Sequence, residues 1–202
     1  VLLFVGSLIH RKGFDILMQA FNMVASHDER FYLLAVGPNS KDENPSLDEE
    51  FLEHVVKELE GKPASQRFLL PGLIQDRARL AEVYRASDVF VFPSRNEGLP
   101  SVLLEAMATG LVPVVSDLPV FQSIIQPNVN GIIVPGEDTH ALAESLLRVP
   151  EDWEMRQRLG KSARESVLDR HSFQAWQAQI SRFYQTFPAR AKSIKSGYDT
   201  LT

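Results

Sequence analysis

Two carboxylates, Glu97 and Glu105, lie in the stretch RNEGLPSVLLEAMATG, which runs from Arg95 to Gly110. Glu105 falls inside an apolar run that predicts a buried helix, and Glu97 lies just before that helix. A buried carboxylate without a partner is costly, so Glu105 is expected to bind a ligand or to pair with an arginine. Two carboxylates facing one cleft would suit the vicinal hydroxyls of a sugar. A solvated Glu97 and a structural Glu105 are the alternative, and the residue types alone leave both open.

Pro100 is suited to the first turn of the helix that carries Glu105. This placement predicts that the amides of Leu99 and Ser101 point toward a ligand. A second stretch, GSLIHRKG from Gly6 to Gly13, places Arg11 and Lys12 directly before another predicted helix. A helix N-terminus beside two cations suits a phosphate or diphosphate. By itself, however, this pattern is more typical of an exposed turn.

Several kinds of site are absent from the sequence. The chain has no cysteine, no pair of aspartates two residues apart, and no glycine fingerprint of a dinucleotide site. Its 202 residues are 44% hydrophobic and carry a net charge of −5, without the broad basic field that nucleic acid requires. We therefore expect a soluble cytoplasmic protein with no cofactor, no metal and no nucleic-acid partner.

Apolar strands and helical periods alternate along the chain. Strands are predicted at 1–5, 31–37, 67–72, 88–94, 112–117 and 130–135, and helices at 14–25, 47–59, 77–86, 101–110, 139–148, 151–169 and 172–187. This alternation predicts an α/β fold with a Rossmann-like, doubly wound parallel sheet. Ligands of such sheets bind beyond the carboxyl ends of the strands. Both stretches that could do chemistry follow predicted strands, and no interior linker divides the domain.

The block EGLPSVLLEAMATGLVPVVSD resembles the E-x7-E region of retaining GT-B glycosyltransferases, the large group 1 family. The resemblance continues in FVGSLIHRKGFDILMQAF, LLAVGP, FLLPGLI, VYRASDVFVFPSRNEGLP, NGIIVP and HSFQAW, and it covers nearly all of residues 1–187. The matched order implies the C-terminal, donor-binding domain, which is one half of a GT-B fold. The E-x7-E block and the Lys-Gly start are far more specific together than either is alone.

The resemblance implies a role for each matched residue. Lys12 would neutralise the diphosphate leaving group, with Arg11 beside it and with Gly6 and Ser7 in the same loop. Glu97 would contact the hydroxyls of the donor sugar, and Glu105 the ribose. Glu97 and Lys12 are thus the implied catalytic residues. The remaining donor-binding positions are the segment Gly98, Leu99, Pro100 and Ser101, whose amides approach the sugar and distal phosphate, and, for the base, Leu73 and Ile74.

Four positions depart from the family pattern. Ser7 stands where many members have arginine, and Pro100 where glycine is frequent, which removes a backbone donor. Pro119 and Val120 replace a common glycine pair. These changes bear on the identity of the sugar more than on the class of enzyme.

The predicted function is the transfer of a hexose, with retention, from a nucleoside-diphosphate sugar to an acceptor hydroxyl. The resemblance implies that the N-terminal acceptor domain is absent from this chain and that the isolated domain is inactive. Residues 188–202 show no apolar period and are expected to form a frayed tail. Expected partners are a UDP-, GDP- or ADP-hexose and the missing domain, through which alone a membrane would be contacted. The alternatives are a non-catalytic nucleotide-binding module of the same fold and a nucleotide-sugar epimerase.

Overall fold

The chain is represented by a computed structural model that describes residues 1–186. The predicted tail at 188–202, and Phe187 at the end of the last predicted helix, lie outside the described residues.

Six parallel strands form one sheet in the order β3-β2-β1-β4-β5-β6. The strands are β1 (Leu2–Val5), β2 (Leu33–Val36), β3 (Phe68–Leu69), β4 (Val89–Phe92), β5 (Val112–Ser116) and β6 (Ile132–Val134). Every residue of β1, β4 and β5 is buried, as expected of strands covered on both faces. The strand order reverses between β1 and β4, where ligands of such sheets bind. The predicted doubly wound α/β fold is confirmed.

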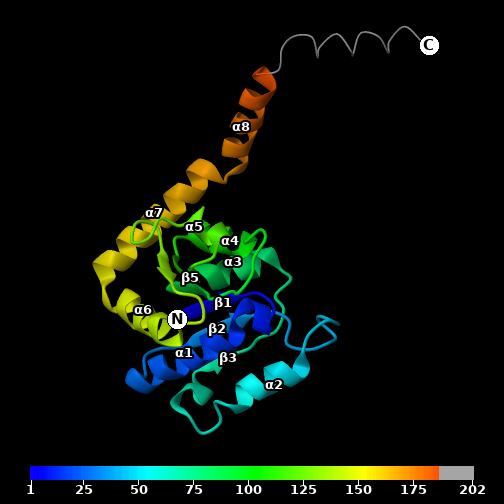
Figure 1. The fold of residues 1–202 in the computed structure, drawn as a ribbon, viewed down its shortest axis with the longest axis vertical. Helices are drawn as coiled ribbons and strands as arrows, with labels where there is room; N and C mark the ends of the chain where they lie inside the picture. Colours follow the sequence, from blue (N-terminus) through cyan, green and yellow to red (C-terminus); the bar gives the residue numbers. More distant parts are fainter. Residues whose placement is uncertain (187–202) are drawn as a thin grey trace, which may run out of the picture.

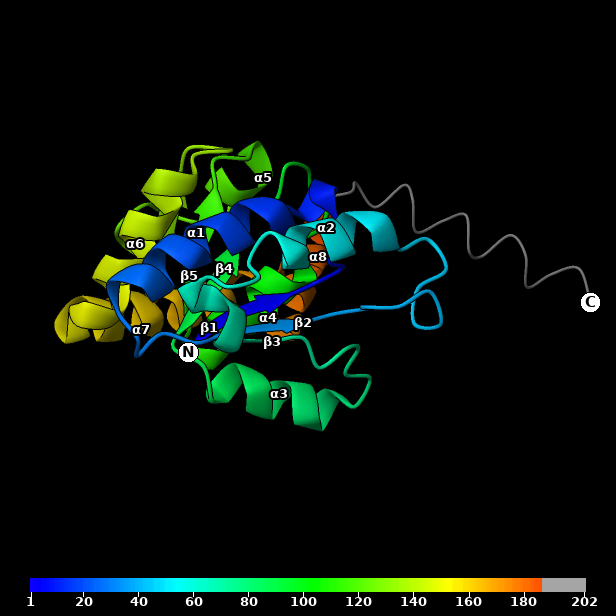
Figure 2. The ribbon, with the colours of Figure 1, turned by 90° about the horizontal axis from the view of Figure 1, so that it is seen from below.

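Helices cover both faces of this sheet. Helices α1 and α6 pack against each other on one face, and α3 lies on the opposite face (Figure 2). Helix α4 packs against α3 and α7. The main helices are α1 (Phe14–His27), α2 (Glu49–Lys57), α3 (Arg77–Arg85), α4 (Ser101–Thr109), α6 (Thr139–Glu151), α7 (Trp153–Arg170) and α8 (Phe173–Gln185).

Local side-chain chemistry accounts for where several helices begin. An aspartate side chain accepts a hydrogen bond from a first-turn amide at α2, α3, α6 and α7, and Ser172 does the same at α8. Asp152 both ends α6 and caps α7. Helix α6 therefore runs past the predicted end at Arg148, with Pro150 in its last turn, because the Asp152 amide still donates to the Arg148 carbonyl (3.1 Å).

Three short helical segments were not predicted from the sequence. They are η1 (His10–Lys12), η2 (Pro63–Gln66) and α5 (Pro119–Gln122). Segments of three or four residues are too short to show a hydrophobic period, so the pattern analysis placed them in loops. Of these, η1 matters most here, because it carries Lys12.

Helix α8 stands apart from the sheet. Figure 1 shows it leading away from the rest of the described chain, and none of its residues is buried. Within residues 1–186, no helix is both long enough and apolar enough to cross a membrane.

Candidate functional site

The turn that carries Lys12 lies against the loop after β4. Gly13, which follows η1, has φ of +70°, and a Cβ at this position would come within 1.9 Å of the Pro93 carbonyl oxygen. Only glycine permits both the left-handed conformation and this approach. A further contact joins the same two segments: the Arg95 amide donates to the Arg11 carbonyl oxygen (2.9 Å). The loops after β1 and β4 therefore meet at the carboxyl edge of the sheet.

Lys12 and Glu97 meet at this junction. The Lys12 Nζ lies 2.6 Å from the Glu97 Oε1, and the two side chains are only 16% and 5% exposed. Lys12 also lies over the Phe92 ring, with Nζ 5.2 Å from the ring centre. The hydroxyl of Ser94 lies 2.8 Å from the same Glu97 oxygen and can donate to it. The two residues implied to be catalytic are thus brought together from positions 85 residues apart.

This pairing offsets the charge of Lys12. An anion that approached the Lys12 ammonium group would have to compete with the Glu97 carboxylate for it. Because Glu97 is almost completely removed from solvent, water screens the pair weakly. Binding of an anion here therefore requires Lys12 to exchange or share its partner.

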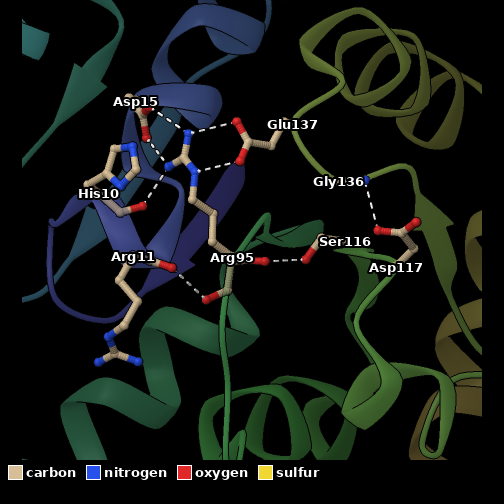
Figure 3. A network of polar contacts seen from close by, with 9 residues as sticks. His10, Arg11, Asp15, Arg95, Ser116, Asp117, Gly136 and Glu137 are labelled. Carbon is tan, nitrogen blue, oxygen red and sulfur yellow. Dashed lines mark hydrogen bonds and ion pairs between the residues drawn. The ribbon is translucent and has the colours of Figure 1, made fainter.

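Arg11 is the cation of this turn that remains exposed. Its side chain makes one described contact, from Nη1 to the Asn96 carbonyl oxygen at 3.3 Å. In Figure 3 the Arg11 guanidinium points away from the neighbouring cluster around Arg95. Gly6 and Ser7 begin the same loop and are half-buried, and the Gly6 amide is already used by the Val36 carbonyl (2.9 Å). Among these residues, Arg11 has the most freedom to meet a ligand.

The segment from Gly98 to Ser101 offers two free amides. Within residues 1–186, the N–H groups of Gly98 and Leu99 donate to no other group, and both residues are exposed. The expectation of a free Ser101 amide was wrong, because this amide donates to the Leu99 carbonyl (2.9 Å). Pro100 is buried and precedes the first helical residue of α4, which turns the chain tightly enough for that bond.

Glu105 differs from its predicted environment, because it is exposed rather than buried. Helix α4 buries Leu103, Ala106 and Met107, while Ser101 and Glu105, four residues apart, lie on its outer face. The apolar run concealed this because a helix needs only part of its circumference to be apolar. Glu105 accepts a hydrogen bond from the hydroxyl of buried Tyr84 at 3.1 Å.

The Tyr84 hydroxyl can donate to the Glu105 carboxylate only while the phenol is protonated. Burial, followed by the charge of Glu105 and the hydrogen bond to it, raises the pKa of the Tyr84 phenol far above its ordinary value. The phenol therefore stays protonated and keeps one Glu105 oxygen in place. The other oxygen has no described partner among residues 1–186 and can accept from a ligand hydroxyl.

A hollow of about 480 Å³ lies beside Glu105. Its lining includes Gln75, Arg77 and Tyr84, which come from α3 and the loop before it. The predicted base-contact residues belong to that same loop: Leu73 is 40% exposed, whereas Ile74 is half-buried against the core. Glu97 does not line this hollow, so the two carboxylates occupy different surroundings.

Glu43 holds the Leu73 loop in place. Its carboxylate accepts from the Leu73 amide at 3.2 Å and from the Asn39 amide at 3.0 Å. The sequence offered no signal for this contact, because Glu43 lies in an irregular polar stretch. It ties the loop after β2 to the loop after β3.

Two further observations delimit the site. Within residues 1–186, no three His, Asp or Glu side chains gather in a group that could hold a metal ion. A hollow of about 700 Å³ between α1 and the loop after β6, lined by Asn22, Lys62 and His140 among others, contains neither Lys12 nor either predicted carboxylate. The candidate site is therefore defined by its side-chain chemistry and not by the volume of a cavity.

Three residues that organise this site carry no signal in the sequence. Ser94 supports Glu97, and Tyr84 supports Glu105. Arg95 contacts His10, Asp15 and Glu137, which belong to three segments (Figure 3). Arg95 begins the stretch that carries Glu97 and Glu105, but its type and position alone do not distinguish it from a solvated arginine.

Comparison with known proteins identifies the family. The sequence profile described as "Glycosyl transferases group 1" matches residues 1–166. The chain belongs to the group 1 glycosyltransferases. The family resemblance inferred from the E-x7-E block and the Lys-Gly start is thereby confirmed.

Three relatives of this group 1 chain show how much of each protein is shared. The D-inositol 3-phosphate glycosyltransferase of Corynebacterium urealyticum is 31% identical over 192 residues, which cover 92% of this chain and 42% of the relative. Sucrose-phosphate synthase from Thermosynechococcus elongatus aligns with a TM-score of 0.78 and 30% identity over 91% of this chain and 44% of its own. Anabaena HepE, solved in complex with UDP-glucose, aligns with a TM-score of 0.79 and 18% identity over 92% of this chain and 48% of its own.

These coverages have a direct consequence for the whole protein. The chain spans about two-fifths of the length of the curated relative that it matches. The predicted fold is confirmed by the solved structures, whereas activity, substrate and partners belong to proteins more than twice as long.

Proposed function

We propose that this chain is the donor-binding domain of a retaining glycosyltransferase that transfers a hexose from a nucleoside-diphosphate sugar to an acceptor hydroxyl. The observation that carries this proposal is the Lys12–Glu97 pair at the carboxyl edge of the sheet. Lys12 is a cation suited to a diphosphate, and Glu97 is an acceptor suited to sugar hydroxyls. The two side chains are hydrogen-bonded to each other. The free amides of Gly98 and Leu99 follow directly in the chain.

The proposed roles run along the donor molecule. Lys12 and Arg11 would bind the diphosphate and stabilise the negative charge that develops on it as the bond to the sugar breaks. Glu97 would accept hydrogen bonds from sugar hydroxyls, and the amides of Gly98 and Leu99 would contact the sugar and the distal phosphate. Glu105 would accept from the ribose, which is consistent with its exposed position and its unused oxygen.

The base would then lie against Leu73 and Ile74, near the hollow lined by Gln75 and Arg77. HepE was solved with UDP-glucose, so UDP is the first probe to use. We propose that binding needs no metal, because cations and backbone amides can supply the stabilisation that a divalent ion provides elsewhere. The predicted cytoplasmic location remains a prediction.

The partner that we propose is an N-terminal acceptor domain of the same protein, because the chain spans only part of its relatives. Helix α8 is suited to contact that domain: Phe173, Trp176 and Ile180 lie on one face and are 69%, 55% and 37% exposed. Without the acceptor domain, we expect this chain to bind the donor and to transfer little.

Thermal unfolding with UDP, GDP and ADP in the presence of EDTA tests this function. We expect one of the three to raise the melting temperature, since a ligand at a hundredfold excess over its Kd stabilises by about 2.7 kcal/mol. Lys12→Ala should abolish most of the shift. Stabilisation that requires Mg²⁺ or Mn²⁺ would contradict metal-free binding. No response to any nucleotide would contradict the donor-binding role.

A further inference from the structure

Arg95 has every one of its side-chain N–H groups in use. An arginine side chain carries one N–H donor on Nε and two on each Nη, in a planar fork. Nη1 donates to the His10 carbonyl (2.6 Å) and to Asp15 Oδ1 (2.7 Å), and Nη2 donates to Asp15 Oδ2 (2.9 Å) and Glu137 Oε2 (3.5 Å). Nε donates to Glu137 Oε1 at 3.1 Å. Figure 3 shows the guanidinium enclosed between the two carboxylates and the His10 carbonyl.

These contacts join three parts of the chain at one point. His10 opens η1, Asp15 lies in the first turn of α1, and Glu137 lies in the loop after β6. Arg95 itself belongs to the loop after β4. The shortest contacts are with His10 and Asp15, and the side chains of Arg95 and Asp15 are only 17% and 21% exposed. Glu137 is 67% exposed and makes longer contacts, so it is the weaker partner.

The two strong partners lie on either side of Lys12 in the sequence. The Arg95 side chain holds the chain before Lys12 through His10 and the chain after it through Asp15, while the Arg95 amide binds the Arg11 carbonyl (2.9 Å). A lysine has a long flexible side chain, so the position of its ammonium group depends on how firmly its backbone is held. Arg95 also lies two residues before Glu97 in the chain. It therefore fixes the backbone near both members of the Lys12–Glu97 pair.

We propose that Arg95 is a positioning residue that holds the Lys12 turn where it can bind the diphosphate of the donor. This inference rests on the proposed function of Lys12. Arg95 itself does not touch the ligand, since none of its side-chain N–H groups is left to donate. In this respect it differs from Arg11, whose guanidinium makes one long contact and points away.

Calorimetry with UDP and uridine tests this inference. Arg95→Ala should lower the affinity for UDP by about tenfold or more, because a small displacement of the Lys12 ammonium group has a large effect on binding. Uridine, which lacks the diphosphate, should bind as in the wild type. Asp15→Asn keeps the size of the side chain but removes its charge, so it should show the same selective loss if Arg95→Ala fails to fold.

A matched control is available at the other end of α1. Arg30 forms a forked pair with Asp28, with Nε at 2.9–3.0 Å and Nη2 at 2.5 Å from the carboxylate. Arg30→Ala removes a forked arginine–aspartate pair that is more exposed, with Arg30 at 78%, and lies far from Lys12 in the fold. It should leave both UDP and uridine binding unchanged. A loss of UDP binding in this variant would show that any arginine–aspartate pair has the same effect, and the inference would fail.

A double-mutant cycle with Lys12→Ala separates positioning from general stability. If Arg95 acts through Lys12, Arg95→Ala should weaken UDP little further once Lys12 is already alanine. Additive losses, or equal losses for UDP and uridine, would overturn the positioning role while leaving the proposed function intact. If Lys12→Ala alone leaves UDP binding unchanged, both the proposed function of Lys12 and the role of Arg95 fail.

Discussion

At the scale of single residues, the main feature is that the cation expected to bind a diphosphate is already paired with a carboxylate. Lys12 is expected to bind a diphosphate, yet its ammonium group lies 2.6 Å from a carboxylate that is 5% exposed. The same carboxylate is expected to bind the sugar. A complete donor would relieve this competition, because its diphosphate takes Lys12 while its hydroxyls donate to Glu97.

The first prediction concerns Glu97→Gln. Removing the charge frees Lys12, so UDP should bind about tenfold more tightly, which corresponds to the loss of a competing charged hydrogen bond of ~1.4 kcal/mol. UDP-glucose should gain less or lose affinity, because the sugar then meets a weaker acceptor. Calorimetry with both ligands measures the difference.

The control is Glu49→Gln, which removes the charge from an exposed pair with Lys41 at 3.4 Å and should change neither affinity. Glu105→Gln provides a contrast. If Glu105 binds the ribose, this substitution should lower the affinity for uridine and for UDP alike. Weaker UDP binding by Glu97→Gln would show that Lys12 and Glu97 act together on the diphosphate and do not compete.

A second prediction concerns the pKa of Asp15. Burial alone would raise this pKa, but the hydrogen bonds and charge of Arg95 outweigh burial and hold it below 3.8. In Arg95→Ala the opposing cation is gone, so burial is less offset and the Asp15 pKa should rise relative to the wild type. An NMR titration of the carboxyl carbon in both proteins measures the change.

The same shift predicts how stability depends on pH. A carboxylate whose pKa is lowered on folding contributes fully above the unfolded pKa, and this contribution is lost as the pH falls through the folded value. The difference in unfolding free energy between wild type and Arg95→Ala should therefore be larger at pH 7 than at pH 3. Equal differences at both pH values would show that the pair contributes by packing alone.

At the scale of elements, the packing of α4 on α7 depends on a contact between two glycines. Gly110 ends α4 in the left-handed region with φ of +86°, and Gly160 lies within α7. A Cβ on Gly160 would meet the Gly110 carbonyl oxygen at 2.2 Å. Because the obstacle is backbone, it cannot move without shifting α4, which carries Glu105.

A third prediction follows from this contact. Gly→Ala inside a helix normally stabilises by about 1 kcal/mol, but Gly160→Ala should destabilise by about 1–3 kcal/mol because it forces the two helices apart. Urea unfolding measures the change. Gln157→Ala, on the exposed side of the same helix, should stay within about 0.5 kcal/mol of the wild type. Stabilisation by Gly160→Ala would mean that α7 can move away from α4 at little cost.

At the scale of the whole molecule, the described chain leaves one helix without a partner layer. Phe173, Trp176 and Ile180 follow one another at helical spacing on α8 and are all exposed. An apolar stripe of this kind is usually covered. Because the chain spans 42% of a curated relative, the acceptor domain is the occupant that we propose.

The fourth prediction uses Trp176 as a reporter of this contact. In a Trp153→Phe background, which leaves one tryptophan, Trp176 should emit as a water-exposed indole and be quenched readily by acrylamide. Joined to an acceptor domain whose own tryptophans are replaced by phenylalanine, the same residue should emit at shorter wavelength and resist quenching. Identical spectra in the two proteins would place the domain contact elsewhere.

How far the sequence determined this protein can be judged from particular residues. Unbroken apolar runs such as Val89–Phe92 predicted buried parallel strands, because a strand covered on both faces needs no polar side chain. Lys12 and Glu97 were selected by their types and positions after strands, and by the family pattern around them. These inferences depend on local sequence, and the sheet and the family are confirmed.

Only the tertiary structure decided how these residues are paired. The contact of Lys12 with Glu97 spans 85 residues and that of Arg95 with Asp15 spans 80, so no local pattern could reveal either. Glu105 was expected to be buried because its neighbours are apolar, yet the orientation of α4 against α3 and α7 left it on the outer face. A side chain's environment depends on which elements pack around it, and that arrangement is a property of the folded chain as a whole.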